Sequence, residues 1–182
     1  MLKLQFPQKV KFVCGFIFSD EKGYGCVKKR LCRKFGPLDF ESEPIRFEFT
    51  DYYRAEMGPD LTKRLVSFRR LKDAGDFVGI KRFCVSLEKR YAYKGNRTVN
   101  IDPGYLNEAH LVLTSTKDFY HRIYLGKGIH AEVTVYYKNR RFEDLPWTYP
   151  DFRTPAYKAI LADIRAKYVR QLKPKAALSP KL

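Results

Sequence analysis

Hydrophobic positions at the start of the chain follow first a strand pattern and then a helical one. The run 10–18 is apolar at odd and even positions alike, which is typical of a central strand covered on both faces. An apolar stripe at helical spacing follows it. Because Ser19 or Asp20 can cap this stripe and Gly36-Pro37 stops it, we predict a helix over 19–36.

The same patterns continue to about residue 108. Strands are predicted over 45–50, 65–71 and 98–101, and a helix begins at Asp73 or Asp76 after the second of these strands. Pro103-Gly104 is expected to stop the last strand. The predicted order is therefore β-α-β-β-α-β, the ferredoxin-like pattern.

From His110 onward the apolar spacing changes to two. Strands are predicted over 110–115, 119–125, 129–137 and 141–144, and Thr154-Pro155 begins a last helix. The predicted fold class is α+β, with a ferredoxin-like βαββαβ core followed by an antiparallel β-meander and a C-terminal helix. The meander is expected to cover the face of the first strand that the two early helices leave open.

These elements predict a single domain over residues 1–172. Its parts are a ferredoxin-like half (1–108), the meander (109–145), and a crossover with the C-terminal helix (146–172). Residues 173–182, KPKAALSPKL, are predicted to form a basic flexible tail, because their prolines break helix and no apolar stripe continues.

Positive charge is the most unusual property of the composition. The chain holds 36 Lys and Arg against 20 Asp and Glu, a net charge of +16 at pH 7. Such an excess favours a polyanionic or phosphorylated partner, although a proteome-wide bias would give the same count. Two runs, KKRLCRK (28–34) and TKRLVSFRRLK (62–72), could form a basic stripe for phosphates.

The chain lacks the sequence features of a membrane or secreted protein. No apolar run reaches the roughly 18 residues that a membrane span needs, and the first residues lack a signal-peptide pattern. We therefore expect a cytoplasmic protein with no membrane partner, and the sequence leaves the oligomeric state open.

The segment 115–129, STKDFYHRIYLGKGI, combines a predicted hairpin with basic side chains. Pairing across the turn at 126–128 places Arg122 opposite Glu132, a cross-strand charge pair. We expect Arg122 to face outward beside Glu132, and His121 to point toward the junction of the meander with the ferredoxin-like half.

Candidate site residues gather around this hairpin and at strand ends. The candidate anion-binding residues are Lys117, His121 and Arg122. The candidate acidic residues are Asp51, Asp102 and Glu132, and three carboxylates could hold Mg²⁺, which takes oxygen ligands. The candidate supporting polar residues are Asn100, Ser115 and Thr116.

Four ordered blocks give the chain a family resemblance. They are ESEPIRFEFTDYYRAEMG (41–58), VNIDPGYL (99–106), LTSTKDFYHRIYLGKGIHAEVTVYY (113–137) and LPWTYPDFRTPAY (145–157). With these blocks the chain resembles an uncharacterised prokaryotic family, a domain of unknown function (DUF 4416), over nearly its whole length. The resemblance implies no established activity, substrate or catalytic residue.

Three classes of function are compatible with these residues. The first is a module that binds a phosphate-bearing ligand, RNA or a nucleotide, through a basic surface. The second is a metal-assisted enzyme that acts on a phosphorylated small molecule at the junction of the two halves. The third is an interaction or scaffold protein without catalysis.

Overall fold

One antiparallel sheet organises the protein. The computed structural model describes residues 7–173, and the predicted tail beyond Lys173 lies outside the described residues. The elements are β1 (Lys11–Phe18), α1 (Glu21–Phe35), β2 (Leu38–Glu41), β3 (Ile45–Arg46), α2 (Arg54–Met57), β4 (Thr62–Phe68), α3 (Phe77–Arg90), β5 (Val99–Leu106), β6 (His110–Ser115), β7 (Ile123–Gly126), β8 (Ile129–Lys138), β9 (Arg141–Asp144) and α4 (Pro155–Leu172). Four helices accompany a nine-stranded sheet, which confirms the α+β class.

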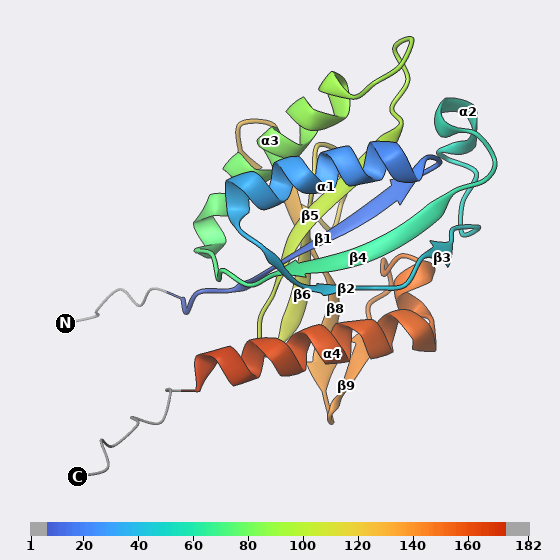
Figure 1. Ribbon diagram of the computed structural model, residues 1–182. Helices are drawn as coiled ribbons and strands as arrows, with labels where there is room; N and C mark the ends of the chain where they lie inside the picture. The colour runs from blue at the N-terminus through green and yellow to red at the C-terminus, as the bar shows by residue number, and fades with distance from the viewer. Residues whose placement is uncertain (1–6, 174–182) are drawn as a thin grey trace.

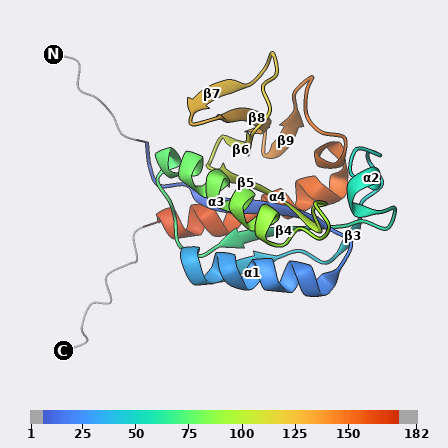
Figure 2. The same ribbon diagram turned by 90° about the horizontal axis from the view of Figure 1, so that it is seen from above.

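Helices lie on both faces of the sheet (Figure 1). The strand order is β2-β4-β1-β5-β6-β8-β7, with β3 beside β4 and β9 beside β8. Helices α1 and α3 cover one face, and α4 lies against the other. Seen from above in Figure 2, strands β7 to β9 lie at the side of the molecule away from α1.

The core between the sheet and helices α1 and α3 is rich in aromatic rings. Phe12 of β1 stacks on Phe68 of β4, with ring centroids 4.3 Å apart. Phe35 and Phe77, from the two helices, meet the Phe12 ring edge-on. These contacts bury the face of β1 toward α1 and α3, and the strand is buried along its whole length, as its apolar run predicted.

The second face of β1 is covered by α4 and not by the meander, which corrects the prediction. Strands β6 to β9 extend the sheet sideways, because β6 pairs with β5 on one edge and with β8 on the other. The buried stripe of α4 includes Leu161 and Ile164, and it packs into one cluster with Val13 of β1 and Leu65 of β4.

The strand after α1 lies earlier in the chain than predicted. Leu38–Glu41 pairs with β4, whereas the predicted strand 45–50 contributes only Ile45–Arg46. Phe47 instead joins a small cluster with Ile17 and Met57. Alternation in this segment therefore comes from a loop that buries its own aromatic side chain, and not from a strand.

Strand β5 does not stop at Pro103-Gly104 but continues to Leu106. Backbone groups of a strand point alternately to its two edges. The N–H and C=O of Ile101 point away from β1, since both bond to α3 side chains, and the nitrogen of Pro103 points the same way. That edge has no paired strand at Pro103, so the missing N–H of proline costs no ladder hydrogen bond.

The predicted hairpin around residues 126–128 is present. All three turn residues, Gly126, Lys127 and Gly128, have positive φ. Ile123 pairs with Ala131 and Tyr124 with His130, and a register shift after Tyr124 places Gly126 opposite Ile129. The strand begins only at Ile123, and its apolar side chains are largely exposed.

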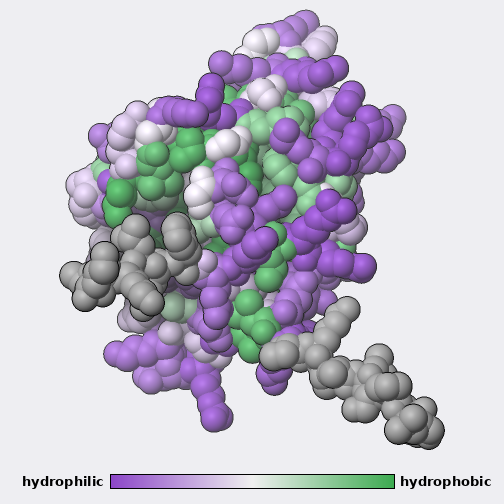
Figure 3. Space-filling model, turned by 90° about the vertical axis from the view of Figure 1, so that its left-hand side faces the viewer, coloured by the Kyte–Doolittle hydropathy of each residue, from purple (hydrophilic) through white to green (hydrophobic). Residues whose placement is uncertain are grey.

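Hydrophilic side chains dominate the face shown in Figure 3, with smaller hydrophobic areas between them. Within residues 7–173, no helix has the length and apolar character that crossing a membrane requires.

Candidate ligand-binding pocket

The sheet splits between β5 and β6, and this split makes room for a pocket. The two strands pair only over Gly104–Leu106 and Leu111–Leu113. They meet tightly at Gly104, where an added Cβ would clash with the carbonyl oxygen of Val112. Before Gly104 the two strands are unpaired, so β5 presents a free edge there.

Helix α3 satisfies the free edge of β5 with two buried charged side chains. The Nζ of Lys81 donates to the carbonyl of Ile101 at 2.8 Å, and a carboxylate oxygen of Glu88 accepts from the Ile101 N–H at 2.7 Å. Burial raises the pKa of Glu88 above its ordinary value, against the opposing charge of Lys81. The helix therefore takes the place of a strand partner beside the split.

The pocket has a volume of about 520 Å³ and draws its walls from both halves of the chain. Gly15 of β1 lies in its lining, and a Cβ added there would contact Lys63, Leu65 and Asp102. Tyr52 and Tyr53 come from the loop before α2, and Tyr149 comes from the crossover after β9. A pocket of this volume is in the range for small-molecule sites.

A chain of polar contacts runs along one wall. Arg97 forms a two-pronged ion pair with Glu56, which ties α2 to the start of β5. Arg97 also donates to the side-chain oxygen of Asn100 at 2.7 Å, and Asn100 donates to Asp102 at 2.7 Å. Lys81 lies 3.5 Å from the same carboxylate of Asp102. Asn100 and Asp102 are thus fixed in position by their neighbours.

Arg122, another lining residue, connects several segments. Its Nε donates to Glu132 at 2.8 Å, one Nη donates to the carbonyl of Lys117 at 3.0 Å, and the other donates to the hydroxyl of Tyr149 at 2.8 Å. Burial and the charge of Glu132 raise the pKa of Tyr149 to about 12. The hydroxyl of Tyr149 is therefore protonated at neutral pH.

His121 lies behind Glu132. Its Nε2 is 2.7 Å from a Glu132 carboxylate oxygen, and its ring stacks on Trp147 at a centroid distance of 5.0 Å. Trp147 in turn donates to the carbonyl of Val133 at 2.8 Å. Glu132 is therefore supported from behind by a ring that is itself packed in place.

A buried ion pair belongs to the pocket lining. Lys63 of β4 bonds to Asp151 of the crossover, and both side chains are almost fully buried. The Nζ of Lys63 also lies within 5.4 Å of the ring centroids of Phe47, Phe152 and Tyr157. The ammonium group of Lys63 is therefore surrounded by one carboxylate and three aromatic rings, and it connects the crossover to the sheet.

Lys117 differs from the other cations of the pocket lining in its partner, which is a tyrosine and not a carboxylate. Lys63, Lys81, Arg97 and Arg122 each contact a carboxylate. Over residues 7–173, no acidic group lies within ion-pair distance of Lys117. Its partner is Tyr52, whose hydroxyl it contacts and whose ring centroid is 3.8 Å from Nζ. This hydrogen bond lowers the pKa of Tyr52.

The structure brings most of the sequence-predicted site residues into this pocket. The lining includes Asn100, Asp102, Ser115, Thr116, Lys117, Arg122 and Glu132. Asp51 is not among the lining residues; its side chain is 87% exposed and pairs with Arg54.

The predicted orientations of His121 and Arg122 were wrong. Arg122 lines the pocket, whereas His121 lies outside the lining and contacts the lining residue Glu132. The apolar neighbours in β7 do not mark a core-facing side, because Ile123 is 71% exposed. The apolar alternation along β7 therefore does not show which of the two preceding side chains, His121 or Arg122, points into the pocket.

Several lining residues were missed by sequence reasoning. A signal existed for Lys81 and Glu88, which follow Phe77 by four and eleven positions and so share the helix face of Phe77 and Cys84. Charged residues on an apolar stripe indicate buried partners. Tyr52, Tyr53 and Arg97 carried no comparable signal, since their place depends on how a loop folds back.

The three carboxylates predicted to hold Mg²⁺ do not come together. Asp102 and Glu132 line the pocket, but Asp51 lies outside it. Among residues 7–173, no group of three or more His, Cys, Asp or Glu side chains has an arrangement that could hold a metal ion.

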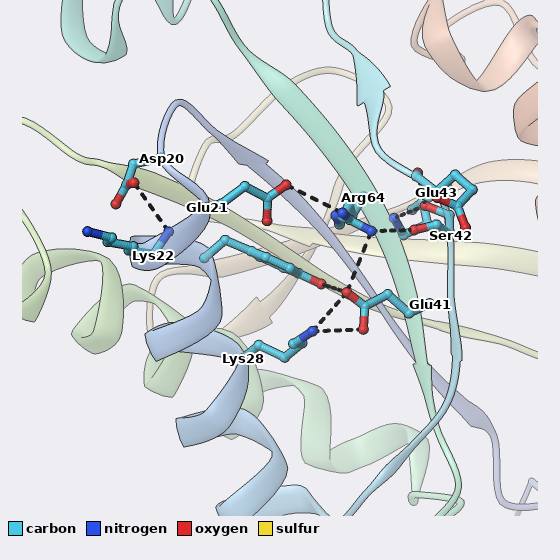
Figure 4. A network of polar contacts seen from close by, with 10 residues as sticks. Asp20, Glu21, Lys22, Lys28, Glu41, Ser42, Glu43 and Arg64 are labelled. Atoms are coloured by element: carbon cyan, nitrogen blue, oxygen red, sulfur yellow. Dashed lines mark hydrogen bonds and ion pairs between the residues drawn. The ribbon is translucent and has the colours of Figure 1, made fainter.

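The two basic runs are partly used inside the fold. Lys28 of α1 and Arg64 of β4 both contact the carboxylate of Glu41, at 2.8 and 3.8 Å, and Tyr24 donates to it (Figure 4). Arg64 also donates to the carbonyl of Ser42 at 2.9 Å. These cations hold α1 against the edge of the sheet and are not free for a phosphate.

Fold and pocket together define an α+β protein with a pocket of charged and aromatic side chains in the split of an antiparallel sheet. The chain belongs to the family described as Domain of unknown function (DUF4416), whose family model matches residues 8–168. The resemblance drawn from the four sequence blocks is thereby confirmed. Comparison with curated proteins and with solved structures gives no significant match.

Proposed function

We propose that the protein binds a small phosphate-bearing ligand of nucleotide size in the pocket between its two halves. The observation that carries this proposal is Lys117, the lining cation without a carboxylate partner in the described residues, at the exposed rim. A phosphate bound there could form an ion pair with the Lys117 ammonium group, and no ion pair between that group and a carboxylate would have to break first.

Aromatic side chains beside Lys117 support a ligand with a flat ring. Tyr52 and Tyr149 are both partly exposed and both belong to the lining. Tyrosine rings offer stacking area together with a hydroxyl, a combination suited to a base or a sugar. The 520 Å³ volume accommodates one such molecule.

The pocket is a better candidate than the outer surface for the phosphate site. Lys28, Lys63 and Arg64 of the two basic runs are already paired with carboxylates. A surface site for RNA would depend on the remaining exposed cations, whose effect would be weakened by salt.

Calorimetric titration with adenosine 5′-monophosphate (AMP), adenosine and a 12-residue oligouridylate tests this proposal. We expect AMP to bind more tightly than adenosine, and Lys117→Met to weaken AMP about tenfold, the loss of one charge-assisted contact of about 1.4 kcal/mol. Lys138→Met, at the exposed end of β8, is the matched control and should leave AMP affinity unchanged. Undetectable AMP binding, or tighter binding of the oligonucleotide that Lys117→Met leaves intact, would contradict the proposal.

We also propose that the first half is a ferredoxin-like unit. The order β2-β4-β1-β5, antiparallel throughout, with α1 and α3 on one face supports this interpretation. The pocket would then lie at the junction between this ferredoxin-like unit and the meander.

A further inference from the structure

Glu132 belongs to the pocket lining, and one of its two carboxylate oxygens has no hydrogen-bond partner within residues 7–173. Its carboxylate is 2% exposed, and Oε2 accepts from Nε of Arg122 at 2.8 Å and lies 2.7 Å from Nε2 of His121. Oε1 is buried and has no hydrogen-bond partner in the part of the chain between residues 7 and 173. A buried acceptor without a partner costs free energy, so its presence in a pocket lining points to a ligand group.

The residues around Glu132 determine which kind of ligand group can donate a hydrogen bond to Oε1. The guanidinium of Arg122 already balances the carboxylate charge, which removes the advantage of a cationic donor. Oε2 is taken by two partners, so a two-pronged contact with both oxygens is not available. A neutral group that offers one hydrogen is the donor that fits, and a hydroxyl is such a group.

The position of Arg122 relates this oxygen to the proposed phosphate site. One guanidinium spans from the carbonyl of Lys117 to the carboxylate of Glu132. Glu132 is therefore one guanidinium group away from the backbone of Lys117, the residue whose Nζ is proposed to hold the phosphate. In a nucleotide, the hydroxyls of the sugar are the donors nearest to the phosphate.

We propose that Oε1 of Glu132 accepts a hydrogen bond from a sugar hydroxyl, so that the pocket selects ribonucleotides over forms that lack these hydroxyls. The inference rests on the proposed function, and it adds a specificity-determining residue and a ligand class. His121 and Trp147 act as positioning residues, since they hold the carboxylate from behind and do not line the pocket.

Titration of the full chain with AMP, 2′,3′-dideoxy-AMP and inorganic phosphate tests the inference. We expect AMP to bind at least tenfold more tightly than dideoxy-AMP. Glu132→Gln should lower that ratio at least threefold, because an amide hydrogen bond is weaker than one to a carboxylate. Glu143→Gln, on β9 outside the pocket lining, is the control and should keep the ratio. If Glu132→Gln does not fold, Glu132→Asp keeps the charge beside Arg122 but withdraws the oxygen, and it should also lower the ratio.

The outcomes separate this inference from the proposed function. Equal binding of AMP and dideoxy-AMP, with both weakened by Lys117→Met, would overturn the role of Glu132 and leave the phosphate site standing. A tenfold preference that both Glu132 variants keep would assign the hydroxyl to another residue and would also overturn the inference. Absence of binding by all three probes would overturn the proposed function and the inference together.

Discussion

Pro103 and Gly104 are neighbours in β5, but the strand edge is unpaired at Pro103 and packed against β6 at Gly104. At Pro103 the edge is unpaired, and the carbonyl of this residue accepts from the hydroxyl of Thr114. At Gly104 the edge closes against β6, where the backbone of Val112 leaves no space for a side chain. The dipeptide therefore marks the point at which the sheet stops being split.

Gly104→Ala should destabilise the fold by about 3 kcal/mol, because the added Cβ forces the backbones of β5 and β6 apart. Gly79→Ala is the matched control. Gly79 lies inside α3 with open space where its Cβ would be, so the same change should stabilise by about 0.5–1 kcal/mol. Urea unfolding followed by circular dichroism measures both, and equal effects of the two changes would contradict this account of the split.

The site residues show which local patterns carry information. Lys117 and Arg122 were singled out because basic groups cluster near a glycine-framed turn, and both line the pocket. The assignment of inward and outward faces failed for His121 and Arg122, since both residues precede β7 and both side chains are largely buried against Glu132. Asp51 failed because its strand was itself mispredicted.

At the scale of elements, periodicity succeeded where a segment buries one long stripe. Helix α4 and strands β6 and β8 lie within a residue or two of their predicted bounds for this reason. Strand β2 was missed because it buries none of its four side chains fully, whereas the equally short β9 buries Phe142 and was predicted. Strand β5 was cut short because its unpaired proline edge depends on α3, a contact that no local pattern contains.

The contact between α3 and β5 makes stability depend on pH. Burial raises the folded-state pKa of Glu88 above its ordinary value of 4.5. Its contribution to stability is therefore fully present below pH 4.5 and is lost as the pH rises through the higher folded value.

Glu88→Gln removes this titration and keeps an acceptor for the N–H of Ile101. Relative to wild type, we expect the variant to gain free energy of unfolding as the pH rises above 4.5. Urea unfolding at a series of pH values measures the difference. Glu108→Gln, at an exposed turn, should show no such trend. A gap between wild type and Glu88→Gln that stays constant with pH would show that Glu88 does not titrate as described.

At the scale of the whole molecule, one sheet joins both halves of the chain, and α4 covers the face that the early helices leave open. Periodicity showed that β1 needs cover on both faces but not which element supplies it. The pocket belongs to this scale, because β5, β6, β8, α3, the loop before α2 and the crossover each contribute to it. No single motif could predict it.

A crystal structure of the protein with AMP tests the central claim most directly. We predict that the phosphate lies within about 3–4 Å of the Nζ of Lys117, with the sugar directed toward Glu132 inside the 520 Å³ pocket. AMP bound on the outer face of α1, or in the pocket with its phosphate away from Lys117, would contradict it.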